Sequence, residues 1–82
     1  MFLLIKNMLI NMDYIKALRV EKEFECFALV ADMIDGVEIK LTRGSSEINK
    51  AEEALIKIGQ GISEAKENDI LSIDAICSRM DV

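Results

Sequence analysis

The segment Phe24-Glu25-Cys26-Phe27-Ala28-Leu29-Val30-Ala31-Asp32-Met33-Ile34 decides the fold that this sequence predicts. Apolar side chains lie on both sides of an extended chain: one side carries Phe24, Cys26, Ala28, Val30 and Ile34, and the other carries Phe27, Leu29, Ala31 and Met33. A strand that is apolar on both sides lies in the middle of a sheet covered on both faces, or turns its second face toward another chain. We therefore expect a central strand at 24–34.

The residues around this segment predict further strands joined by short turns. Asp35-Gly36 is typical of a type I′ hairpin turn, and apolar and polar residues then alternate over 37–42. Before the segment, apolar or alternating runs at 2–5, 8–12 and 15–23 are separated by turn-forming residues. The pattern predicts an antiparallel β-meander of four or five strands over residues 1–44.

Residues 45–66 predict one amphipathic helix. A serine oxygen can cap its start, and the apolar positions then recur at helical spacing: Ile48, Ala51, Leu55, Ile58, Ile62 and Ala65. Gly59 and Gly61 disfavour the second half, so the helix ends near Ile58 or continues to Lys66. Residues 68–82 fit either a strand or a helix. We expect a single α+β domain over 1–82, with the helix packed on one sheet face and a short C-terminal element.

Composition excludes several classes of function. The 82 residues contain no histidine, which rules out Ser-His-Asp triads, Cys-His dyads and histidine metal sites, and two cysteines are too few for a four-thiolate zinc site. The formal net charge of −5 has the wrong sign for binding a phosphate backbone. We therefore expect no enzyme activity, no metal, no cofactor and no nucleic-acid partner.

The early apolar run and the two cysteines bear on where the protein works. The run from Met1 to Ile5 stops at Lys6, far short of the roughly 20 apolar residues that span a membrane. We expect no membrane segment, no secretory signal and a cytoplasmic location. Cys26 and Cys77 are then expected to be buried free thiols, and a disulfide between them is the alternative.

One candidate interaction surface is apolar. It consists of Phe27, Leu29 and Met33, which share one side of the predicted central strand. An 82-residue domain buries only about 60–65 % of the surface of its unfolded chain, so a second apolar sheet face is an expected docking surface. This surface predicts contact with another protein and self-association into a homo-oligomer.

The second candidate surface is acidic. Glu21, Glu23 and Glu25 alternate, so on a regular strand they would line one face, where they could hold a divalent cation or meet a basic partner. The alternative is a solvated strand end and hairpin loop, with a turn at Glu23-Phe24, where like charges discourage edge pairing. Asp32 is expected either to pair with Lys40 or Arg43 or to lie exposed beside the turn.

Two resemblances go beyond these patterns. Leu9-Ile10-Asn11-Met12-Asp13-Tyr14-Ile15, followed by Asp35-Gly36 and Leu41-Thr42, resembles small bacterial proteins of the FlbD flagellar type, which combine a β-meander with a final helix. That resemblance implies a small non-enzymatic bacterial protein. Residues 35–44 are also similar to a segment of the tryptophan-activated RNA-binding attenuation protein, a ring of β-sandwich subunits. That likeness implies a tryptophan-holding loop at Thr42, Arg43 and Gly44, although the Lys-x-Arg strand pattern for RNA is missing here.

Three functions follow as hypotheses. The first is a cytoplasmic, self-associating bacterial module that binds another protein. The second is a small acidic inhibitor of the phage type, which would block the basic nucleic-acid-binding surface of a defence nuclease by charge complementarity. The third, from the second resemblance, is a ring-forming binder of a ligand or of RNA.

Overall fold

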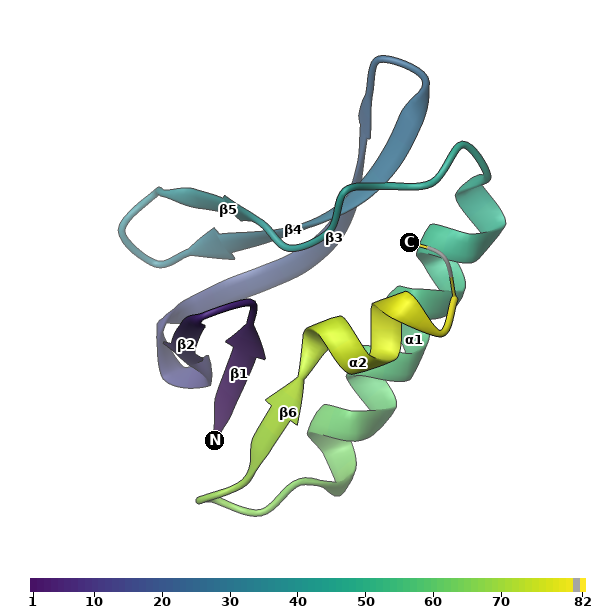
Figure 1. The fold of residues 1–82 in the computed structure, drawn as a ribbon. Coiled ribbons are helices and arrows are strands. Elements are labelled where there is room, and N and C mark those ends of the chain that lie inside the picture. The colour runs from purple at the N-terminus through teal and green to yellow at the C-terminus, as the bar shows by residue number, and fades with distance from the viewer. Residues whose placement is uncertain (81) are drawn as a thin grey trace.

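The strands of the computed structural model, which describes residues 1–80 and 82, form two separate three-stranded sheets. The first sheet has the order β2-β1-β6 and the second the order β3-β4-β5 (Figure 1). The strands are β1 (Phe2–Ile5), β2 (Met8–Asn11), β3 (Ile15–Glu23), β4 (Cys26–Met33), β5 (Glu38–Lys40) and β6 (Ile70–Ser72). The predicted α+β class is confirmed, and the expected meander divides into two sheets.

The division between the sheets falls at Met12–Tyr14, a single 3-10 turn. The side chain of Asn11 accepts a hydrogen bond from the backbone N–H of Asp13 at 3.0 Å, which turns the chain away from β2. The next strand, β3, therefore starts a new sheet. At the start of this strand, the backbone N–H of Ile34 donates a hydrogen bond to the carbonyl of Tyr14. The local polar contact of Asn11 stabilises the turn at which the predicted meander divides into two layers.

The central position of β4 is confirmed, and the strand is shorter than predicted. β4 pairs with β3 on one side and with β5 on the other, both antiparallel. Phe24 and Ile34 lie outside it, in the turns that precede and follow the strand. The second turn is not the expected type I′ turn, because Gly36 alone in it has a positive φ, of 91°, while the Asp35 side chain accepts the N–H of Val37.

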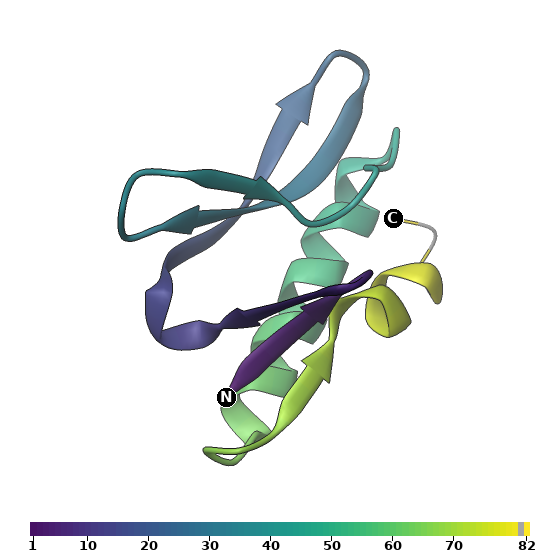
Figure 2. The ribbon, with the colours of Figure 1, turned by 60° about the vertical axis from the view of Figure 1, so that its left-hand side comes forward.

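The long helix α1 (Ile48–Glu64) covers both sheets from one side (Figures 1 and 2). Its buried residues are Ala51, Ala54 and Ile58. The helix continues through both glycines because the second is a packing position: a β-carbon at Gly61 would lie 2.9 Å from Cδ1 of Leu71. Gly59 has no such neighbour.

The sequence of the segment after α1 fits either a strand or a helix, and the segment forms one of each. β6 adds parallel to β1, with Leu3 opposite Leu71, and α2 (Ile73–Ser78) follows at once. The hydroxyl of Ser72 caps this short helix by accepting the N–H of Ala75 at 3.3 Å.

One core joins all the layers. It contains buried residues from both sheets and both helices: Leu3, Ile5, Ile10, Leu29, Ala31, Leu41, Ala54, Ile58, Ile73 and Cys77. Within the part of the chain that the structure describes, none of the helices has the length and apolar character needed to cross a membrane.

Candidate functional site: the outer face of β3-β4-β5 and its hairpin tip

The predicted apolar docking surface lies against the protein's own core. Leu29 is only 1 % exposed, and Phe27 and Met33 on the same side of β4 are half-buried. Leu29 and Met33 pack in the core that α1 helps to form. The expectation that these three residues form an open docking surface is corrected, because α1 covers the face to which they belong.

The opposite side of β4 is covered as well, by charged side chains rather than by a second chain. Ala28 and Val30 are 1 % and 3 % exposed. Val30 is flanked by Arg19 on β3 and by Lys40 on β5, whose long aliphatic stems can cover it. The predicted excess of apolar surface on this side came mainly from Phe24 and Ile34, which lie in turns.

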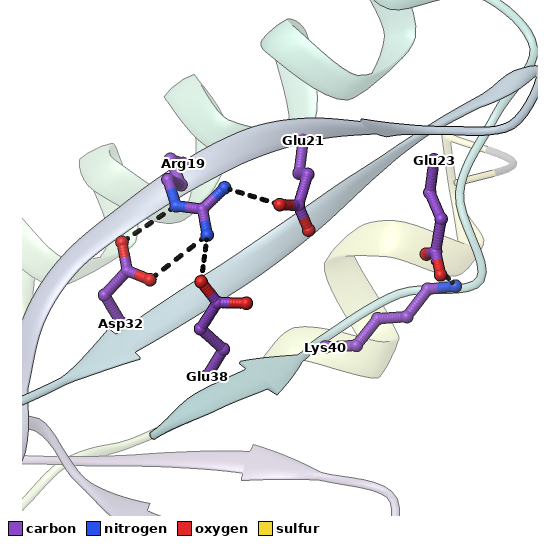
Figure 3. A network of polar contacts seen from close by, with 6 residues as sticks. All are labelled: Arg19, Glu21, Glu23, Asp32, Glu38 and Lys40. Atoms are coloured by element: carbon purple, nitrogen blue, oxygen red, sulfur yellow. Dashed lines mark hydrogen bonds and ion pairs between the residues drawn. The ribbon is translucent and has the colours of Figure 1, made fainter. Parts of the chain in front are cut away.

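We call this side the outer face and define it by six charged residues: Arg19, Glu21, Glu23, Asp32, Glu38 and Lys40 (Figure 3). Four carboxylates stand against two cations, so the outer face carries excess negative charge. These residues come from all three strands of the sheet, and the side chains project away from α1.

Arg19 is the centre of the outer face. Its guanidinium donates from Nε and Nη2 to both oxygens of Asp32, at 2.8 and 3.2 Å, and from Nη2 to Glu38 at 2.8 Å. Nη1 lies 3.2 Å from Glu21. Hydrogen bonds to Asp32 and then to Glu21 raise the pKa of Arg19 further above its usual range. One cation therefore ties β3, β4 and β5 together.

Asp32 thus pairs with a residue that the sequence prediction did not consider. Because only two residues separate Glu23 from Cys26, Ala17 lies opposite Asp32 and Arg19 opposite Val30. Arg19 is therefore a diagonal neighbour of Asp32 on the same face. Counting outward from a two-residue turn at 24–25 would have found this pair in the sequence.

The predicted acidic group is only partly brought together. Glu21 and Glu23 share the outer face, where Glu23 pairs with Lys40 at 2.8 Å, while Glu25 lies exposed in the turn. Among the described residues, no group of carboxylates or thiols is arranged to hold a metal ion.

The tip of the β3–β4 hairpin carries the most unusual residue of the chain. Phe24 is 92 % exposed, and its φ of 56° lies in the left-handed region. Glycine is preferred at the first position of hairpin turns of this kind, and a side chain there costs about 1–2 kcal/mol. The hairpin extends beyond the rest of its sheet (Figure 1), which accords with the high exposure of Phe24.

A separate groove, of about 1130 Å³, lies between the β5–α1 connection and α2. Thr42, Arg43 and Gly44 line it together with Lys6 and Asp74. The hydroxyl of Thr42 accepts the backbone N–H of Leu29 at 3.1 Å, and Gly44 has a φ of 98°. A β-carbon at Gly44 would lie 3.2 Å from the carbonyl oxygen of Phe27, so this connection needs glycine.

Both cysteines are free thiols, which decides the open question of a disulfide. Cys77 is buried as predicted, whereas Cys26 is exposed near the hairpin tip. Desolvation, with the nearby charge of Asp74 as a smaller cause, raises the pKa of Cys77 to about 11.

Comparison of this chain with protein-family models, with curated proteins and with solved structures finds no match. Its function therefore has to be argued from the outer face, the hairpin tip and the groove.

Proposed function

We propose that this chain is a small, non-enzymatic protein-interaction module that docks on a basic surface of another protein. The docking surface is Phe24 at the hairpin tip together with the outer face beside it. The observation that carries the proposal is the exposure of Phe24, 92 %, at a φ of 56°.

The argument from Phe24 is energetic. An exposed aromatic ring contributes little to folding, and the left-handed backbone at its position lowers stability. Aromatic side chains, Phe among them, are enriched at protein interfaces relative to the rest of the surface. A ring that destabilises the free protein therefore favours a role in binding.

The argument from the outer face is electrostatic. Three of its four carboxylates lie on the same hairpin as Phe24, and Glu23 and Glu25 flank Phe24 in the sequence. Complementary charge speeds and orients association with a basic partner. The negative net charge of −5 favours such a partner over nucleic acid. The two free thiols are compatible with a cytoplasmic location, which is part of the proposal.

The acidic inhibitor is the narrower form of the same proposal. A nuclease that binds nucleic acid offers the basic surface that the outer face would complement. In that case, nucleic acid competes with this chain for the nuclease, and added salt weakens the complex. A complex that resists high salt or that binds nucleic acid at the same time would contradict it.

The groove favours a second candidate, the binding of a small ligand. Thr42, Arg43 and Gly44, which the tryptophan-dependent family suggests as ligand residues, line this groove. Titration calorimetry with tryptophan tests the candidate, and the Arg43→Ala variant is the control. Absence of heat at millimolar tryptophan would remove it.

Affinity capture with matched variants tests the main proposal. The bait proteins are the wild type, Phe24→Gly and Lys6→Gly, and the lysate comes from the organism that encodes the chain. Lys6 is the matched control because it is also an exposed turn residue, with a φ of 54°. We expect one basic protein on the wild type and on Lys6→Gly, and roughly tenfold less of it on Phe24→Gly.

Two results would contradict this proposal. In the first, the three baits retain the same proteins in equal amounts, so that Phe24 plays no part. In the second, the protein lost from Phe24→Gly is acidic, so that the outer face repels it.

A further inference from the structure

The edge of β3 that faces away from β4 is open. β3 is the first strand in the order β3-β4-β5 and pairs with β4 alone. In the described residues, no backbone hydrogen bond crosses its other edge. A nine-residue strand at the edge of a sheet is a template for another strand.

The hydrogen bonds of β4 show which groups β3 turns outward. Both backbone groups of Phe27 bond to Ser45, and the carbonyl of Leu29 accepts from Leu41. The residues opposite them on β3 are Lys22 and Val20. Their backbone groups therefore point away from β4, as do those of Leu18 by the alternation of an antiparallel pair.

Space for the side chains of an added strand lies below this edge. A groove of about 480 Å³ runs between β3 and α1, and its apolar walls are Leu18, Val20, Phe27, Ile48 and Leu55. Ile48 is 46 % exposed there. The ammonium of Lys22 lies 5.9 Å from the ring centroid of Phe27. This cation–π contact holds the Lys22 side chain against its own hairpin, so the charge does not block an added strand.

We propose that β3 of a second copy of this chain occupies the open edge, antiparallel, with Val20 opposite Val20. This inference deepens the proposed function, because it joins two outer faces into one surface on a six-stranded sheet. It uses the backbone edge and the charges of β3, and it does not depend on Phe24.

The charges of β3 select this register. We call the side of β3 that faces α1 its inner face. Sliding one β3 strand along the other by two residues at a time keeps the inner faces of the two copies on the same side of the joined sheet. With Val20 at the centre, Arg19 of each copy lies opposite Glu21 of the other, which gives two pairs of opposite charge. The register is therefore complementary to itself, as a two-fold interface requires.

Each neighbouring register either places like charges opposite each other or pairs no opposite charges. Centring on Arg19 places Arg19 opposite Arg19 and Lys16 opposite Lys22. Centring on Glu21 also gives two pairs of opposite charge, Arg19 with Glu23, but it places Glu21 directly opposite Glu21. Centring on Leu18 pairs no opposite charges. Like charges directly opposite each other destabilise a sheet.

Sedimentation equilibrium across a range of micromolar concentrations tests the proposal. We expect the wild type to move from 9.2 kDa toward twice that mass as concentration rises. Glu21→Arg places cations opposite Arg19 and should raise the dimer dissociation constant roughly tenfold or more. Glu53→Arg makes the same change of charge on an exposed position of α1 and should leave the constant unchanged.

Amide hydrogen exchange locates the interface. On dimerisation, the amides of Leu18, Val20 and Lys22 should become protected, and those of β5 should not. Val20→Pro removes an outward N–H without removing a bond to β4 and should prevent dimerisation. If this variant does not fold, Glu21→Arg still decides the question.

Three results would overturn the proposal. They are a wild type that stays at 9.2 kDa at every concentration, a dimer without protection at β3, and a dimer that Glu21→Arg leaves intact. If the wild type stays monomeric while capture of the basic partner still depends on Phe24, the dimer is refuted and the proposed docking surface is not. If the chain dimerises through β3 but captures the same proteins with and without the Phe24 side chain, the proposed docking surface is refuted and the dimer is not.

Discussion

Replacing Phe24 with glycine is expected to stabilise the protein, although it removes an aromatic side chain. A residue with a β-carbon at a φ of 56° loses about 1–2 kcal/mol relative to an allowed backbone. Glycine in turn lowers the free energy of unfolding by about 0.5–1 kcal/mol, because its unfolded chain has more conformational entropy. Because the ring is 92 % exposed, its loss removes only about 0.2 kcal/mol of burial.

The expected net gain in the free energy of unfolding for Phe24→Gly is therefore about 0.5–1 kcal/mol. Urea unfolding followed by circular dichroism measures it, as a midpoint increase of roughly 0.3–0.5 M with an unchanged slope. Thermal unfolding should show an increase in Tm of about 3–6 °C.

Two further variants separate backbone from side chain. Phe24→Ala removes the ring and keeps the β-carbon, so the free energy of unfolding should stay within about 0.5 kcal/mol of the wild-type value. Lys6→Gly, at a φ of 54°, should give the same gain as Phe24→Gly. If both Phe24 variants lower the midpoint equally, the ring is packed in solution, and the argument for its role in binding fails.

Four other substitutions test the fold. Gly59→Ala should raise the free energy of unfolding by about 1 kcal/mol through helix propensity, and Gly61→Ala should give clearly less because Leu71 has to move; equal gains in urea unfolding would contradict the packing. Leu29→Ala should destabilise by about 2–5 kcal/mol in the same assay, and a loss below 1 kcal/mol would mean that α1 does not cover β4. The pKa of Cys77, raised from about 9 to about 11, means that the unfolded chain ionises first. Stability should therefore fall by about 2–3 kcal/mol between these pH values, and a Cys77→Val variant, lacking the thiol, should not show this part of the loss.

Local patterns predicted most of the elements. Alternation over 15–23 and 37–42, the apolar segment around Leu29 and the helical spacing from Ile48 correspond to β3, β5, β4 and α1. Each of these signals lies within a few residues along the chain. The division into two sheets, by contrast, depends on an Asn11 hydrogen bond and on pairing with residues far along the chain, which periodicity does not report.

The candidate site was only partly predictable. Glu21 and Glu23 were identified from their alternation, whereas Phe24 was assigned to a strand face because its turn contains no glycine or proline. Ala28 and Val30 made the outer face look apolar. They are small enough for the stems of Arg19 and Lys40 to cover, an arrangement that depends on the register of three strands.

The parallel pairing of β1 with β6 has a consequence for how the chain folds during synthesis. Phe2 leaves the ribosome before its neighbour Ile70, which follows 68 residues later in the chain. Until then β1 has only β2 as a partner, and an isolated hairpin of this size is marginally stable in water. The nascent chain therefore exposes the unpaired edge of the apolar strand β1 until β6 has been synthesised, and a chaperone that shields short hydrophobic strands should increase the yield of folded protein.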